Sequence, residues 1–278
     1  MFAPLIIAIV LLLTVSFHSF SAFAADGEQV LEPASGTGLS DGIRTMGEDA
    51  KALLTAPARM DRHDWLLAGG AAGALGLAFA LDKPINTFVE RNQHAKPHDV
   101  ADVFNAIGNP AVVLAANVGM VAFGSFQESY GYSTRLKQTG LISLEAEVFA
   151  MAATFGLKEI SGRSRPDRHE GITKFDPFGN GGSSFTSAHA AASFAMASVI
   201  ADRYESGWLA YGVAGAVAAS RVYTQQHFSS DVVAGGLIGW GIGRFLSRRH
   251  SDDVNAWRVQ PAQLLDGSGM GMAIGRRF

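Results

Sequence analysis

The chain has 278 residues, of which 48% are hydrophobic and 17% are charged, and its mean hydropathy is +0.16. This length and composition fit one helical domain with an ample core. Cysteine is absent, which excludes disulfides and thiolate metal sites, and the net charge of −3 without a long basic run argues against nucleic acid as a partner.

The N-terminal part of the chain is predicted to hold a leader and a polar lead-in. Residues 1–24 have the features of a signal peptide or an N-terminal anchor. Leu5–Leu13 is apolar and Ala22–Ala24 fits the small-residue rule before a cleavage point, although no Lys or Arg precedes the apolar stretch. Residues 25–64 then combine a polar segment with a helical apolar spacing between Ile43 and Met60.

Residues 65–250 are predicted to form the main domain, an all-α bundle of about six helices. The apolar segments that would form them are Trp65–Leu81, Pro110–Phe126, Leu141–Leu157, Ala188–Ala201, Trp208–Ala219 and Val232–Leu246. Their Ala and Gly content permits close helix packing, but several are shorter than the ~20 residues that cross a bilayer. Glu145 and Glu147 would be unusual in contact with lipid. The tail, residues 251–278, is predicted to hold a short hairpin.

Three separate stretches of the chain carry residue types that handle phosphate. They are Lys158–Pro166, Ser184–His189 and Ser220–Asp231. Together they supply three cations for an anionic group, two imidazoles for covalent and acid–base work, and a carboxylate that could orient one imidazole. This inventory favours phosphoryl transfer through a phosphohistidine, a reaction that requires no metal.

The spacing within each stretch predicts how these side chains meet. Lys158 and Arg165 are two turns apart and should share one face of a helix that Pro166 ends. His227 and Asp231 are one turn apart, so the carboxylate should accept a hydrogen bond from the imidazole and fix its tautomer. A serine at position 187, before an apolar helix, should act as the N-cap of an anion site.

These motifs closely resemble those of the type-2 phosphatidic acid phosphatase and vanadium haloperoxidase superfamily. KEISGRSRP at Lys158–Pro166 and SRVYTQQHFSSD at Ser220–Asp231 match the family pattern in residue type and spacing. The middle motif departs from it, because Thr186 replaces the family proline and Ala188 replaces the glycine. The resemblance covers roughly residues 141–246, the motif core, and it implies the helical bundle of that superfamily.

The resemblance also implies a role for each matching residue. His227 would be the nucleophile, Asp231 its carboxylate partner and His189 the general acid and base. The remaining matches would bind the phosphate, with no metal and no cofactor: Lys158, Arg165, Ser187, Ala188 and Arg221.

The implied function is hydrolysis of a phosphomonoester or a pyrophosphate. The leading substrates are lipid phosphates, such as phosphatidate, an isoprenoid pyrophosphate or a lipid A type molecule, at the outer face of the inner membrane of a bacterial cell envelope. The main alternative is a soluble periplasmic acid phosphatase that acts on small phosphorylated molecules. A vanadium-dependent haloperoxidase and an inactive envelope scaffold are the other readings, and the sequence leaves the oligomeric state open.

Charged residues around the apolar segments bear on the orientation. Basic residues precede the first and third segments and follow the last: Lys51, Arg59, Arg62, Arg135, Lys137, Arg244, Arg248 and Arg249. By the positive-inside rule these ends are cytoplasmic, which places all three motifs outside. A cleaved leader would reverse this orientation for a six-span bundle, so the sequence leaves open both a membrane-embedded bundle and a soluble periplasmic one.

Overall fold

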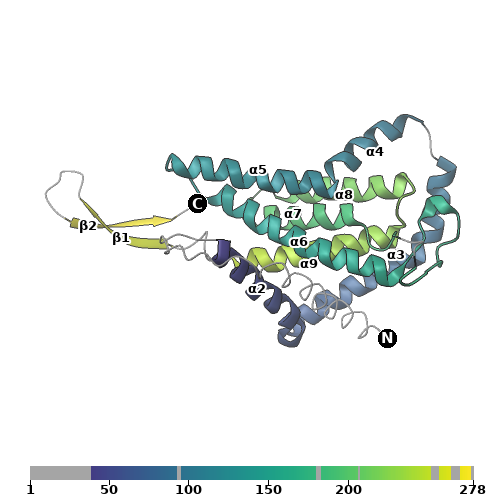
Figure 1. The fold of residues 1–278 in the computed structure, drawn as a ribbon, viewed down its shortest axis with the longest axis horizontal. Helices are drawn as coiled ribbons and strands as arrows, with labels where there is room; N and C mark the ends of the chain where they lie inside the picture. The colour runs from purple at the N-terminus through teal and green to yellow at the C-terminus, as the bar shows by residue number, and fades with distance from the viewer. Residues whose placement is uncertain are drawn as a thin grey trace, which may run out of the picture.

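The structure, a computed structural model, describes residues 39–92, 95–179, 183–205, 207–251, 257–263 and 270–276. The leader predicted in residues 1–24 lies outside these ranges. The predicted all-α bundle is confirmed (Figure 1). Within the described residues, the α-helices are α2 (Leu39–Thr55), α3 (Arg62–Asn92), α4 (Ala95–Ile107), α5 (Pro110–Ser129), α6 (Arg135–Ser161), α7 (Ala188–Arg203), α8 (Trp208–Tyr223) and α9 (Ser229–Arg249).

The described part therefore holds eight α-helices, where about six were predicted. Six of them contain the apolar segments of the sequence, and α2 contains most of the predicted amphipathic stretch. The helix that was missed is α4, because its sequence mixes a few apolar residues with Asp99 and Asp102 and has no long apolar run. Short 3-10 turns lie at Ala56–Arg59 and Pro166–Arg168.

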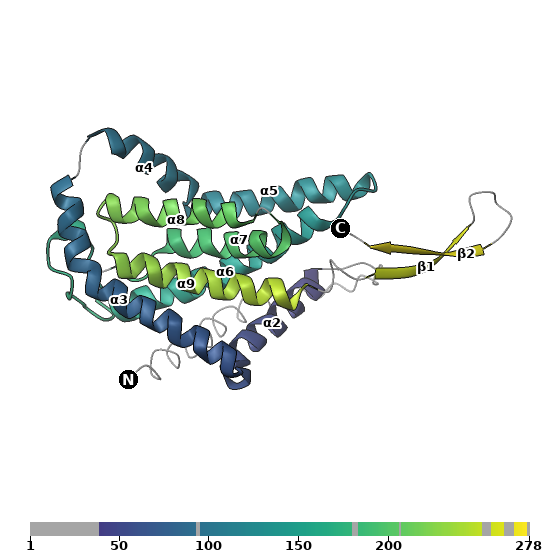
Figure 2. The same ribbon diagram turned by 180° about the vertical axis from the view of Figure 1, so that it is seen from behind.

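Helix α7 lies at the centre of the bundle and packs against α6, α8 and α9 (Figures 1 and 2). Its contact with α9 is the most extensive between helices in the described ranges, and Gly235, Gly239 and Gly243 of α9 face the α7 backbone. A Cβ at Gly235 would collide with the carbonyl oxygen of Ser187, and the other two glycines approach carbonyls one and two turns further along. This stripe of small residues lets two backbones touch, and it holds the start of α7 in place.

Three helices in the described part of the chain are long and apolar enough to cross a membrane: α3, α5 and α6. Helices α3 and α5 expose large apolar side chains, among them Leu66, Leu77 and Phe123. Exposed apolar surface of this extent suits contact with lipid, and it marks the chain as a membrane protein.

Glu145 and Glu147 of α6, which would be unusual in contact with lipid, have polar partners inside the protein. Glu147 is buried and accepts a hydrogen bond of 2.9 Å from the amide of Asn117 on α5. Glu145 lies beside Asp49 of α2 and His250, with the ligand atoms of the three residues within 4.8 Å of one another. Arg249 already donates to Asp49, so this cluster ties α2 to the end of α9.

Beyond the bundle, two antiparallel strands pair in the tail. β1 (Trp257–Gln263) pairs with β2 (Met270–Arg276), with Gln260 opposite Ala273. This hairpin projects away from the helices in both views (Figures 1 and 2) and takes no part in the site.

Candidate active site

The three motif stretches meet at one end of the bundle. Lys158 is in the last turn of α6, Arg221 is in the last turn of α8, and His189 is in the first turn of α7. His227 lies in the connection between α8 and α9. The structure thus brings together residues that are up to 73 positions apart along the sequence, from 158 to 231.

The end of α6 differs from the prediction. The helix stops at Ser161, so Lys158 and Arg165 do not share a helix face, and Pro166 does not end the helix. Gly162 ends it instead, in the left-handed conformation with φ of 53°. A side chain there would also collide with the backbone of Asp176, so the turn requires glycine.

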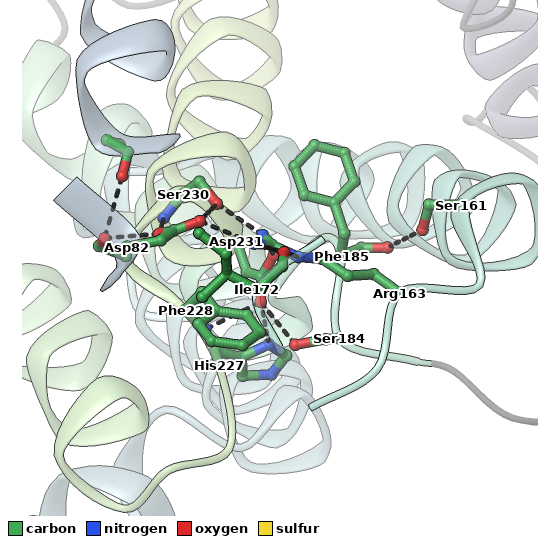
Figure 3. Close-up of polar contacts among 12 residues, drawn as sticks. Asp82, Ser161, Arg163, Ile172, Ser184, Phe185, His227, Phe228, Ser230 and Asp231 are labelled. Atoms are coloured by element: carbon green, nitrogen blue, oxygen red, sulfur yellow. Dashed lines mark hydrogen bonds and ion pairs between the residues drawn. The ribbon is translucent and has the colours of Figure 1, made fainter. Parts of the chain in front are cut away.

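After this turn, Arg163 points into the protein and is 1% exposed. Its guanidinium donates to Asp231 Oδ1 at 2.7 Å, to Asp82 Oδ2 at 2.7 Å and to Ser230 Oγ at 2.6 Å (Figure 3). It also lies over the ring of Phe228, 4.3 Å from the centroid. Arg163 therefore cross-links α3, the loop after α6 and the start of α9.

Asp82 of α3 is the main residue of this region that sequence reasoning missed. It is buried and accepts hydrogen bonds from the Ser230 N–H at 2.8 Å and from the hydroxyl of Ser229 at 2.7 Å, in addition to those from Arg163 and the Ser230 hydroxyl. Asp82 directly follows the predicted apolar segment Trp65–Leu81 and precedes Lys83, so no local pattern marked this carboxylate as buried.

Asp231 and His227 are close but not hydrogen-bonded. His227 Nδ1 lies 3.7 Å from Asp231 Oδ2, so the predicted imidazole–carboxylate hydrogen bond is absent. The reason is that α9 begins at Ser229 and His227 precedes it, so the one-turn spacing of a helix does not apply. Besides Arg163, the carboxylate accepts from Ser184 Oγ at 2.5 Å and from the Phe228 N–H at 2.9 Å.

The three phosphate-binding candidates with cationic side chains are half-buried, and each is held by a neighbour. Lys158 Nζ donates to the carbonyl of Ser183. Arg165 donates to Gln226 Oε1 at 2.7 Å, and Arg221 donates to Asn105 Oδ1 of α4 at 3.1 Å. Gln226 and Asn105 carry no motif signal, which is why the sequence could not assign them this positioning role.

These cations lie close to one another. The charges of Lys158, Arg165 and Arg221 act on one another and on His189. The Nε atoms of both arginines are buried and have no hydrogen-bond partner within the described residues. Several cations with unused donors at one place form a site for a multiply charged anion.

The first turn of α7 lies beside these cations, whose charges act on His189. Ser187 is its N-cap, as predicted, and its hydroxyl accepts from the Ala190 N–H at 3.4 Å. Its own N–H donates to the Asp231 carbonyl at 3.0 Å. The N–H groups of Ala188 and His189 have no acceptor within the helix, and they lie at its positive end. Thr186, at the proline position of the motif, is fully buried and its hydroxyl has no partner among the described residues.

Burial lowers the pKa of His227 to about 4, because the charged imidazolium would lose its water. The nearby Asp231 carboxylate opposes this shift, while Lys158 and Arg221 lower the pKa further. At neutral pH the imidazole is therefore uncharged and keeps a free electron pair, which is the form that can attack phosphorus.

Comparisons with known proteins agree with this arrangement. The family model described as "PAP2 superfamily" matches residues 139–254. This region of the chain therefore resembles the PAP2 superfamily. The match confirms the resemblance that the motifs predicted, and it includes every catalytic and phosphate-binding candidate named above. None of the curated proteins matches the chain.

Among solved structures, the chain is similar to the crystal structure of the first transmembrane PAP2 type phosphatidylglycerolphosphate phosphatase from Bacillus subtilis. The two are 22% identical with a TM-score of 0.52, and the match covers 70% of this chain and 96% of that chain. The shared fold extends beyond the family match.

Proposed function

We propose that this protein hydrolyses a phosphate monoester or pyrophosphate of a lipid through a phosphohistidine at His227. The observation that carries the proposal is the convergence of three held cations and two imidazoles at one end of the bundle. A site of this composition can bind a phosphoryl dianion, attack it and protonate its leaving group without further groups.

In the first step, the uncharged His227 attacks phosphorus through Nε2, because Nδ1 faces Asp231. A P–N bond forms, the P–O bond to the leaving group breaks, and the oxygen takes a proton from His189. The negative charge of the substrate beside His189 favours the protonated form that this step needs. Asp231 stabilises the imidazolium charge at a distance of 3.7 Å.

In the second step, His189 takes a proton from water and the resulting hydroxide attacks phosphorus. The P–N bond breaks, its electron pair returns to His227, and phosphate leaves. Lys158, Arg165, Arg221 and the first N–H groups of α7 bind the non-bridging oxygens throughout. Thus every step uses side chains of this chain, and we propose that activity needs no metal.

A lipid substrate is favoured over a soluble one by the three membrane-competent helices, of which α6 carries Lys158 near its end. The site would then lie where a lipid headgroup meets water. The leading candidates are phosphatidate, isoprenoid pyrophosphates and lipid A type phosphates, and the similar solved enzyme adds phosphatidylglycerolphosphate. We place the site on the periplasmic side of the inner membrane, because basic residues gather at the opposite end of α9.

The test is turnover by the purified full-length protein in detergent. We expect hydrolysis of p-nitrophenyl phosphate, no loss of it on addition of EDTA, and inhibition by orthovanadate, which mimics pentavalent phosphorus. A panel of the four lipid phosphates and of soluble phosphate esters then identifies the substrate class. Activity that EDTA abolishes and Mg²⁺ or Zn²⁺ restores would contradict the proposed chemistry, and faster turnover of soluble esters than of every lipid would contradict the substrate class.

A further inference from the structure

A second pocket of about 640 Å³ lies between the 3-10 turn after α2, the first half of α3 and the second half of α9. It is separate from the active site, and none of the catalytic or phosphate-binding candidates lines it. The lining side chains that matter here are Arg59, Leu67, Trp240, Arg244, Phe245 and Arg248.

The pocket is at the opposite end of the bundle from the active site. Asp231 lies in the first turn of α9 and Arg248 in its last turn, which puts them about 25 Å apart along the helix axis. Along α3, Leu67 of the pocket and Asp82 of the active-site network are about 22 Å apart. Both spacings approach the ~30 Å hydrocarbon thickness of a bilayer, so the pocket lies near the second membrane face.

The pocket has an excess of positive charge. Four arginines line it, against one acidic residue, Asp64. Arg249 is paired with Asp49 and Arg244 with Asp202 at 3.2 Å. By contrast, Arg59 and Arg248 are exposed and have no hydrogen bond or ion pair within the part of the chain that the structure describes. Two cations are therefore available to a ligand.

The rest of the pocket wall is apolar. Leu67, Ala68 and Ala71 of α3 face Trp240 and Phe245 of α9. Leu67 is 44% exposed, and it lies on α3, which is long and apolar enough to span the membrane. A soluble anion would use the arginines and leave this wall uncovered, whereas a molecule with an anionic head and an apolar chain would use both.

We propose that this pocket binds an anionic phospholipid, with its phosphate at Arg59 and Arg248 and an acyl chain along Leu67 and Trp240. The lipid would join α3 to α9, the two helices that also carry Asp82 and Asp231 to the active site. Charge complementarity selects this occupant, because a zwitterionic lipid offers no net charge to two unpaired arginines.

Trp240 provides a direct reporter. The chain has four tryptophans, and replacing Trp65, Trp208 and Trp257 by Phe leaves Trp240 as the single fluorophore. The full-length protein is reconstituted in phosphatidylcholine vesicles that contain increasing fractions of phosphatidylglycerol with brominated acyl chains, or of brominated phosphatidylcholine. We expect the anionic lipid to quench Trp240 at a lower mole fraction than the zwitterionic lipid does.

Arg59→Gln and Arg248→Gln should each weaken the apparent affinity for the anionic lipid about fivefold, given a contribution of about 1 kcal/mol per arginine near a membrane surface. Arg91→Gln is the matched control, because it removes one exposed arginine from the other end of α3 and should change nothing. Gly241→Phe fills the pocket from α9, where an added side chain meets open space, and should reduce quenching by both lipids.

Equal quenching by the two lipids overturns the proposal. This result is expected if the pocket holds no lipid or if another part of the chain covers it. Quenching curves of the Arg59 and Arg248 variants that coincide with the Arg91 curve overturn it as well, as does unchanged quenching in the Gly241 variant. Thermal unfolding of each variant shows that its fold is retained, so that a loss of quenching reports on the pocket.

Discussion

At the scale of single residues, the Asp231 carboxylate has more partners than a catalytic role alone would need. It accepts from Arg163, Ser184 and the Phe228 N–H, and it lies 3.7 Å from the His227 imidazole. These donors keep it ionised inside the protein, where an unpaired carboxylate would take up a proton. A fixed negative charge beside His227 is what stabilises an imidazolium as it forms.

The low pKa of His227 predicts the acid limb of activity. Because burial lowers this pKa to about 4, the nucleophile is uncharged above pH 4 and becomes protonated below it. The protonated imidazole has no electron pair for phosphorus. We expect kcat/KM to fall with a midpoint near pH 4, well below the ordinary value of 6.5 for histidine. A pH profile with a slowly reacting ester measures this midpoint, and a midpoint near 6.5 would contradict the buried, uncharged nucleophile.

Asp82 should matter for both stability and activity. Asp82→Ala leaves Arg163 with a buried charge that has lost one of its two carboxylates, and it removes the acceptor of Ser229 and Ser230. Removing one partner of a buried ion pair costs about 3–5 kcal/mol. We expect a lower thermal midpoint and a large loss of kcat, because Arg163 also holds Asp231. Asp99→Ala, which removes an exposed carboxylate from α4, should leave both unchanged.

At the scale of elements, the glycine stripe of α9 sets where α7 begins. Gly235 touches the backbone of Ser187, so α9 directly supports the anion-binding turn of α7. Gly162 has the corresponding role at the end of α6, since its left-handed turn sends Arg163 inward and Arg165 toward the site. Backbone contacts at these glycines thus fix the positions of catalytic side chains that lie on different helices.

The contact between Gly235 of α9 and Ser187 gives a testable prediction, for which Gly241 on the same helix is the control. Gly235→Ala should push the start of α7 away from α9 and lower the thermal midpoint, as overpacked sites typically lose about 1–3 kcal/mol. It should lower kcat as well, because Ser187 and the adjoining N–H groups would move. Gly241→Ala, on the same helix but facing open space, should cost neither stability nor turnover. Similar behaviour of the two variants would contradict the role given to the stripe.

The sequence was informative about elements wherever one local pattern decided them. The six apolar runs, the N-cap at Ser187 and the order of the motifs were all found from neighbouring residues. Predictions from helical spacing were wrong where a helix boundary falls between the two residues. Helix α6 ends before Gly162, between Lys158 and Arg165, and α9 begins after Phe228, between His227 and Asp231. Asp82 could not be assigned to the site because its partners come from residues far along the chain, whose proximity only the packed bundle creates.

At the scale of the whole molecule, α9 connects two ends of different character. Its 21 residues span about 31 Å, close to the ~30 Å of a bilayer core. The catalytic candidates lie at its start, and Arg248 at its far end and Arg59 on the neighbouring 3-10 turn have no ion-pair partner among the described residues. This polarity accounts for the orientation proposed here, with the site toward the periplasm and the arginines toward the cytoplasm.

The chain lacks cysteine, so single introduced cysteines can test the orientation without background. Phe178, in the loop between α6 and α7, is 76% exposed at the site end, and His63 is exposed at the start of α3. In spheroplasts, a membrane-impermeant maleimide should label Phe178→Cys. It should label His63→Cys only after the membrane is permeabilised. The reverse pattern would place the site in the cytoplasm, and labelling of both without permeabilisation would contradict the membrane-spanning arrangement.

The phosphohistidine is the central claim, and trapping it is the most direct test. The enzyme is mixed with a ³²P-labelled ester that has a good leaving group, quenched with alkali within milliseconds to seconds, and digested for mass spectrometry. We predict an acid-labile label on His227, none in His227→Gln, and more label in His189→Ala, where water attack is slowed but a good leaving group needs no acid. Turnover in the wild-type protein with no label on His227, or with label on another residue, would contradict the account.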